Sequence, residues 1–111
     1  MIKMVIGFKR RDGMTVQEFR DYRREVHAPL LFAIPEAGRI RHFVVSYPVP
    51  APRFPEPSFD AVVEAWFDSE EDMNELYFSE NFRTQVDPDH ANFIDLSSVM
   101  RIVSEEIVVV E

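Results

Sequence analysis

Three histidines carry most of the chemistry open to this chain, which contains no cysteine. His27 stands in the stretch REVHAPLL, where Pro29 predicts the last turn of an amphipathic helix. An imidazole has an ordinary pKa near about 6.5, so His27 could move protons at neutral pH as a general acid or base. Its ring could equally cap the last carbonyls of the helix, where a cation suits the helix dipole. The residues alone leave both interpretations open.

His42 is a second candidate proton carrier, within a segment of strand type. Alternation along a strand places it on one face with Val44 and Ser46. If that face looks toward the helices, His42 joins His27 in a pocket. If it looks toward a partner subunit, His42 is an interface residue.

Glu64 interrupts the apolar run AVVEAWF. A buried carboxylate without a partner costs several kcal/mol, so a partner must pair with it or its pKa must rise. One interpretation is a cross-strand ion pair with Arg101 or Arg41. The other is that Glu64 orients a catalytic histidine or shares a proton with it.

Aromatic side chains could complete a binding site, and Tyr22, Trp66 and Phe67 are candidate substrate-binding residues. Tyr22 could donate a hydrogen bond to a substrate carbonyl, although tyrosines on apolar stripes usually pack with a wet tip. Trp66 and Phe67 are typical of a core, and Trp66 is also placed to line a pocket. His90, in the polar DPDHAN, is typical of a loop.

Composition excludes several classes of function. The formal net charge of -8 argues against a nucleic-acid partner, because phosphate binding depends on clustered Lys and Arg. Only three glycines are present, which argues against a phosphate-cradling loop or a dinucleotide fingerprint. The histidine spacing signals no metal site, and no apolar run is long enough to span a membrane. We therefore expect a cytoplasmic protein that binds no cofactor or metal.

The hydrophobic pattern predicts four strands, at residues 2–10, 39–47, 59–67 and 97–110. The helices begin with recognisable caps. Thr15 and Glu18 form a capping box, and Ser69 with Asp72 resembles a second cap. Polar residues of the first helix, Arg23 among them, are expected to face water. A short helical piece around residues 81–86 and an irregular DPDHANFID complete the chain.

These elements follow the order β-α-β-β-α-β in one domain over residues 1–111. The order is that of an α+β, ferredoxin-like fold, a four-stranded antiparallel sheet with helices on one face. The strands are apolar on both faces, so the face without helices would be an aggregation liability in a monomer. We expect a homodimer in which two sheets meet face to face.

MTVQEFRDYRREVHAPLL, FDAVVEAWFDSEEDM and the late DHANFID resemble the EthD family, within the dimeric α/β-barrel superfamily. The resemblance implies a dimeric α/β barrel with a pocket between sheet and helices in each subunit. It also implies kinship with small, mostly cofactor-independent enzymes that act on aromatic, lactone or polyketide-like molecules. Relatives include oxygenases, cyclases, decarboxylases and isomerases, so the resemblance fixes no single reaction.

Two classes of function follow. The first is a cofactor-independent enzyme acting on a small apolar molecule, with His27 as proton carrier and His42 or Glu64 assisting. The second is a non-catalytic ligand-binding or accessory protein of a degradation or biosynthesis pathway. The proline-rich segment at residues 48–57 could arch over a pocket, embrace a second subunit, or serve only as a surface loop.

Overall fold

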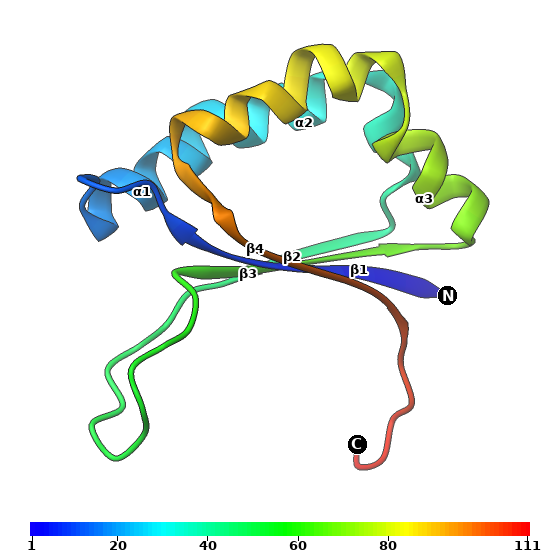
Figure 1. Ribbon diagram of the computed structural model, residues 1–111. Helices are drawn as coiled ribbons and strands as arrows, with labels where there is room; N and C mark the ends of the chain where they lie inside the picture. Colours follow the sequence, from blue (N-terminus) through cyan, green and yellow to red (C-terminus); the bar gives the residue numbers. More distant parts are fainter.

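The computed structural model describes residues 1–111 and places all helices on one face of a four-stranded antiparallel sheet (Figure 1). The spatial order of the strands is β2-β3-β1-β4. Their bounds are β1 Ile2–Arg10, β2 His42–Ser46, β3 Ala61–Phe67 and β4 Ile94–Glu105. This arrangement confirms the predicted α+β, ferredoxin-like fold. None of the helices has both the length and the apolar character needed to cross a membrane.

The helical layer contains two runs, one after β1 and one after β3. The first consists of α1 Val16–Tyr22, the π-helical turn η1 Arg23–His27 and α2 Ala28–Ala33, and a 3-10 turn, η2 Pro35–Arg39, follows it. The second consists of α3 Glu70–Tyr77, the π-helical turn η3 Phe82–Val86 and the 3-10 helix η4 Asp87–Asn92. Both predicted caps are confirmed, since Thr15 and Glu18 bond reciprocally and the Ser69 side chain accepts from the Asp72 N–H.

The first helix does not end at His27. Residues 16–33 are helical throughout, and the backbone at Ala28 keeps right-handed helical angles of φ -59° and ψ -44°. Pro29 has no N–H and its ring crowds the carbonyl four residues earlier, which accounts for the wider turn before it. The N–H of Ala28 reaches the carbonyl of Arg23, five residues back. The interpretation of His27 as a helix-end cap is therefore wrong.

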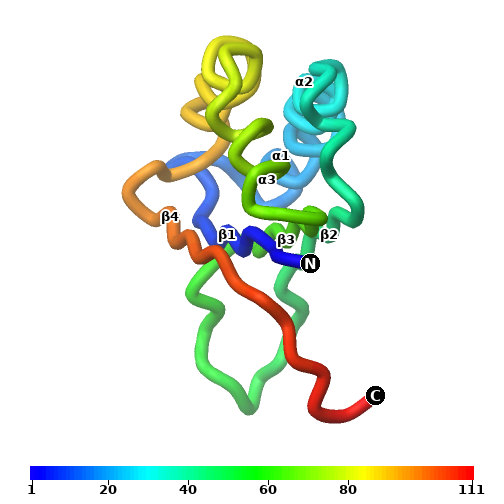
Figure 2. Tube along the Cα trace, turned by 90° about the vertical axis from the view of Figure 1, so that its right-hand side faces the viewer, coloured from blue at the N-terminus to red at the C-terminus, as the bar shows by residue number.

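The two faces of the sheet have different environments, as β3 shows. Ala61, Val63, Ala65 and Phe67 are buried beneath the helices, whereas the alternate residues of the strand point to the other side and are half-buried. The helix-covered side holds the hydrophobic core, which forms two clusters that meet along the sheet. We call the other side the open face, because no helix of this chain covers it (Figure 2).

Two segments extend beyond the sheet on the side of the open face (Figures 1 and 2). One is the proline-rich connection between β2 and β3, and the other is the C-terminal tail after Glu105. The proline-rich segment lines a surface pocket together with residues of β1 and α1, and this pocket does not include His27. The tail, with residues 107–110 between 70 and 88% exposed, continues no strand, so the predicted last strand was placed too far along the chain.

Candidate functional site

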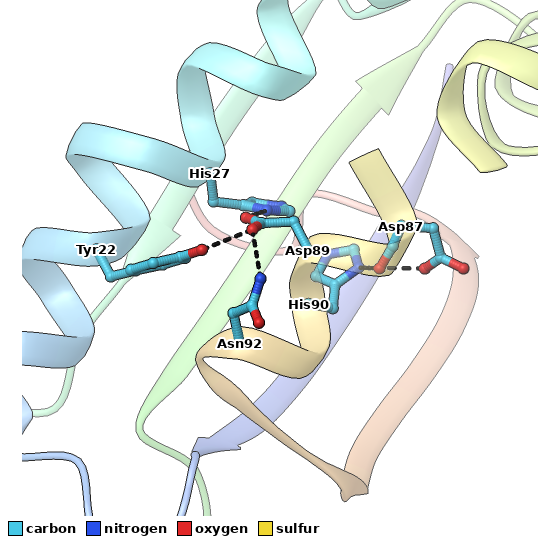
Figure 3. A network of polar contacts seen from close by, with 6 residues as sticks. All are labelled: Tyr22, His27, Asp87, Asp89, His90 and Asn92. Atoms are coloured by element: carbon cyan, nitrogen blue, oxygen red, sulfur yellow. Dashed lines mark hydrogen bonds and ion pairs between the residues drawn. The ribbon is translucent and has the colours of Figure 1, made fainter. Parts of the chain in front are cut away.

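His27 lies inside the helical layer and faces an acidic residue of the second helical run (Figure 3). Its side chain is 6% exposed, and its Nδ1 lies 3.0 Å from Oδ2 of Asp89, whose side chain is 10% exposed. The two residues are 62 positions apart in the sequence, so only the packing of η1 against η4 brings them together. This buried pair is the centre of the candidate site.

Asp89 accepts hydrogen bonds from three side chains. Besides His27, the hydroxyl of Tyr22 donates to Oδ1 over 2.6 Å, and Nδ2 of Asn92 donates to the same oxygen over 3.0 Å (Figure 3). Burial raises the pKa of Asp89, but these three donors outweigh it and leave the pKa below its ordinary value. Asp89 is therefore a carboxylate held in a fixed orientation.

The hydrogen bond to Asp89 determines which nitrogen of His27 carries the proton. A carboxylate can only accept, so Nδ1 of a neutral His27 must be the donor. The lone pair then resides on Nε2, which is free to take a proton from another molecule. A histidine with one nitrogen held by a carboxylate and the other available is the arrangement that general base catalysis uses.

Burial keeps His27 neutral at physiological pH. It is the largest of the effects that lower the pKa of His27 to about 4, and charge on His90 and Arg23 lowers it further. Asp89 acts in the opposite direction but does not offset the burial. His27 therefore enters a reaction as a base, although a weaker one than a histidine with an ordinary pKa.

His90 completes the cluster from η4. Its ring centroid lies 4.4 Å from that of His27, and both rings pack against Phe93. The Nδ1 atom of His90 lies 3.0 Å from the backbone oxygen of Asp87 and 3.1 Å from its carboxylate (Figure 3). The second imidazole is thus oriented by Asp87, although both side chains are more exposed than His27 and Asp89.

The local sequence explains why these groups meet. Each helical run contains a π-helical turn that ends two residues before a proline, at Pro29 in the first run and at Pro88 in the second. Such turns are rare and are frequent at functional sites, since they rotate side chains out of the regular helical spacing. The cluster lies beside both turns.

His42 and Glu64 lie on the open face and do not join His27. His42 pairs with Trp66 across β2 and β3, and their ring centroids are 4.8 Å apart. Glu64 forms an ion pair with Lys3 over 2.7 Å, so its partner is neither Arg101 nor Arg41 as predicted. The prediction of one catalytic group of His27, His42 and Glu64 does not fit this geometry, because the sheet separates them.

The candidate substrate-binding residues are also divided. Trp66 lies on the open face, where its Nε1 donates to Glu106. Phe67 faces the helices but is fully buried, with its ring packed against Tyr77. Tyr22 belongs to the cluster, yet its hydroxyl is engaged by Asp89 and supports that carboxylate instead of pointing to a substrate carbonyl.

Sequence reasoning missed Asp89 and assigned His90 to a loop. Both fall within DHANFID, the late segment that carries part of the family resemblance, and this was the one available signal. Arg23 was also misplaced, because it is 7% exposed where the helical pattern predicted contact with water. The π-helical turn shifts the register of the helix face, and regular helical spacing does not anticipate that shift.

Two surface pockets lie away from the cluster. One, of about 740 Å³, adjoins the turn after β1, and the other, of about 720 Å³, lies beneath the proline-rich connection. Neither borders His27. No three His, Asp or Glu side chains converge in a way that would hold a metal ion.

Known proteins resemble the chain in both sequence and fold. The dehydratase UstZ of Ustilaginoidea virens is 28% identical over 102 residues, which cover 82% of this chain and 72% of that protein. An EthD family protein of Bacillus halodurans superposes with a TM-score of 0.74 at 21% identity, over 96% of this chain and 99% of that one. A dimeric protein with a ferredoxin-like fold from Bacteroides fragilis gives a TM-score of 0.64 at 17% identity, over 95% of both chains.

The family itself follows from a match along most of the chain. The EthD domain matches residues 11–97, a range that includes η1 and η4 and hence both His27 and Asp89. The chain therefore belongs to the EthD domain family.

Proposed function

We propose that this protein is a cofactor-independent enzyme that dehydrates a small apolar hydroxyketone of aromatic or polyketide-like structure. The observation that carries the proposal is the buried His27–Asp89 pair, with Nε2 of His27 left free. The similarity to a dehydratase supports the reaction type. The aromatic residues around His27 favour an apolar ring system as the substrate.

The proposed reaction is an elimination in which one histidine moves the proton. Nε2 of His27 takes a proton from the carbon next to the ketone, and the electrons of that C–H bond form an enolate. The enolate then expels the hydroxyl group on the neighbouring carbon, which leaves as water with the proton that His27 carried. The products are the unsaturated ketone, water and neutral His27, and Asp89 holds the imidazolium in between.

Access to His27 has to involve movement of the helical layer. Its side chain is nearly enclosed, and neither of the two surface pockets described above borders it. We expect η4 to separate from η1 when substrate binds, because the two runs meet there through side chains and not through a sheet. Closure over the substrate would then exclude water from the proton transfer.

A fluorogenic hydroxyketone tests the proposal. 3-Hydroxy-1-tetralone loses water to give 1-naphthol, whose fluorescence reports turnover. We expect the wild-type protein to accelerate this reaction and His27→Gln to lower the rate by roughly a hundredfold or more. His42→Gln is the matched control on the open face and should retain full activity. Full activity in His27→Gln would refute the role of His27 as proton carrier.

The second candidate function is non-catalytic binding of the same class of molecule. The depressed pKa of His27 favours this alternative to some degree, because it weakens the histidine as a base. A binding protein would be stabilised by 1-naphthol in a thermal-shift assay without accelerating the dehydration of 3-hydroxy-1-tetralone. Saturable turnover that depends on His27 would exclude this alternative.

We further propose that a second copy of the chain covers the open face. Val5, Val44 and Ile102 lie on this face, and Ile102 is 51% exposed. The proline-rich connection and the C-terminal tail extend on the same side and would flank the partner (Figure 2). Structural neighbours described as dimeric share the fold. Two sheets meeting face to face would form the barrel that the family resemblance implies.

A further inference from the structure

Arg23 is a buried charge inside the helical layer. It lies in η1, four residues before His27, and its relative exposure is 7%. Four residues make nearly one turn of a π-helix, so both side chains point to the same side of the helix. The guanidinium of Arg23 reaches the sheet, where its central carbon lies 5.6 Å from the ring centroid of Phe43.

No anionic group of the chain neutralises Arg23. None of the ion pairs in the structure includes its side chain, and although the Tyr47 phenol lies within reach of the guanidinium, Nε is fully buried without a hydrogen-bond partner. Burial lowers the pKa of Arg23, an effect that the nearby Tyr47 phenol only partly opposes. A buried charge without a partner is strongly destabilising, so its presence needs an explanation.

The other arginines show that the chain supplies partners elsewhere. Arg10, Arg39 and Arg41 each bond a carboxylate at 2.9 Å or less, although all three are more exposed than Arg23. Arg20, one turn away on the same helix, donates to the backbone oxygen of Pro48. Among these arginines, Arg23 is therefore the most buried and the only one whose charge has no carboxylate or backbone oxygen as a partner.

We propose that Arg23 binds the oxyanion of the substrate beside His27. The inference rests on the proposed function, since the elimination places negative charge on the ketone oxygen when His27 removes the neighbouring proton. A guanidinium close to that oxygen stabilises the enolate more than the neutral ketone, and this difference accelerates the reaction. The ligand class is a ketone, enolate or phenolate oxygen attached to an apolar ring system.

The orientation of the two groups supports this role. Arg23 and His27 are fixed on one helical turn, and the influence of Arg23 on the pKa of His27 shows that its charge reaches the imidazole. The ring of Phe43 supports the guanidinium plane from the sheet side. The site would thus contain a base and an electrostatic stabiliser on the same element, with Asp89 orienting only the base.

Binding of a chromogenic phenol tests the proposal without relying on turnover. 4-Nitrophenol absorbs visible light only as the phenolate, and 4-nitroanisole is its neutral counterpart. We expect the wild-type protein to prefer the phenolate and to lower the pKa of the bound phenol. Arg23→Met should weaken phenolate binding tenfold or more and leave 4-nitroanisole binding unchanged. Arg24→Met removes the same charge from an exposed position and is the matched control.

The results separate this inference from the proposed function. His27→Gln should keep the phenolate preference although it loses turnover. Equal affinity of the wild type for both probes, no phenolate binding at millimolar concentration, or an unchanged preference in Arg23→Met would each overturn the role of Arg23. Full turnover in His27→Gln together with a lost preference in Arg23→Met would refute the proton carrier but retain the oxyanion site.

Arg23→Met should also fold at least as well as the wild type. Removing an uncompensated buried charge in favour of an apolar side chain of similar length often stabilises a protein. A gain in melting temperature with a loss of phenolate binding is the pattern expected of a residue kept for function. Arg23→Lys provides a second variant, which retains the charge but not the planar guanidinium, and should bind phenolate more weakly than the wild type.

Discussion

A histidine lies beside an aromatic ring on each side of the sheet, but the two environments differ. His27, on the helix-covered side, is enclosed and bonded to a carboxylate that itself has three donors. His42, on the open face, is exposed and stacks on Trp66 with no hydrogen bond of its own. Residue type alone makes the two equal candidates. Burial lowers the pKa of His27, and an orienting carboxylate fixes its tautomer.

The reactivity of a histidine therefore depends on its surroundings as much as on its residue type. On the open face, Lys3 bonds Glu64 and Glu106, which produces an ordinary network of surface charges. Within the helical layer, a carboxylate and two imidazoles contact one another, and Arg23 lies four residues before His27 with its Nε unpaired. Buried groups that perturb one another are characteristic of functional sites.

Asp89→Asn is the change expected to have the largest effect on the helix-covered site. An amide in place of the carboxylate can donate to His27 and so reverse its tautomer, which places the proton on Nε2. We expect dehydration of 3-hydroxy-1-tetralone to fall by on the order of 10²–10⁴-fold while the fold is retained. Asp87→Asn, which faces His90, is the matched control and should have a smaller effect. Similar losses in both variants would contradict a specific role for Asp89.

The pH dependence of stability should report the burial of His27. Burial lowers the pKa of His27 to about 4 in the folded protein, from about 6.5 in the unfolded chain. Between these values only the unfolded state binds the proton, so stability is complete above about pH 6.5 and is lost as the pH falls toward 4. The loss amounts to about 3 kcal/mol, measured by urea denaturation at a series of pH values.

His27→Gln should remove most of this dependence. Asp89 also contributes to the loss of protein stability on acidification, because its pKa is lowered in the folded state. A residual dependence of stability on pH is therefore expected in His27→Gln at low pH. A wild-type curve that is flat between pH 6.5 and 4 would show that His27 is not buried in its neutral form.

Ile102→Asp tests the open face. The substitution would place a carboxylate on the proposed interface twice, once from each subunit, so we expect the dimer dissociation constant to rise by about a hundredfold or more. Sedimentation velocity over a range of concentrations measures it. Val26→Asp is the control, because Val26 is 40% exposed on the helical side. A wild-type protein that sediments as a monomer at micromolar concentration would contradict the dimer.

Tyr22→Phe should have the smallest effect of the four changes. It removes one hydrogen bond to a charged acceptor, worth about 1.5–3 kcal/mol, and leaves Asn92 and His27 as donors to Asp89. Thermal denaturation at neutral pH measures the loss. The pKa of Asp89 should rise in this variant, and an unchanged carboxylate titration by NMR would show that Tyr22 is a packing residue only.

Local sequence signals predicted the elements but not the continuity of the first helix. The capping box at Thr15, the cap at Ser69 and the positions of the first three strands are decided by neighbouring residues, and the structure confirms them. Pro29 indicated a helix end, but the chain stays helical through it, with a π-helical turn at Arg23–His27 followed by α2. A proline can end a helix or widen it, and packing of α2 against the rest of the layer decides between the two.

The sequence by itself determined the fold class, the family and the presence of His27 in a distinctive helical segment. Periodicity, caps and strand composition are local properties, so they can be interpreted from one chain. The tertiary structure decided that Asp89, 62 residues away, orients His27, that His42 lies across the sheet, and that Arg23 is buried without a partner. These contacts depend on which helix and sheet faces pack together, and only the packing of the whole chain determines that.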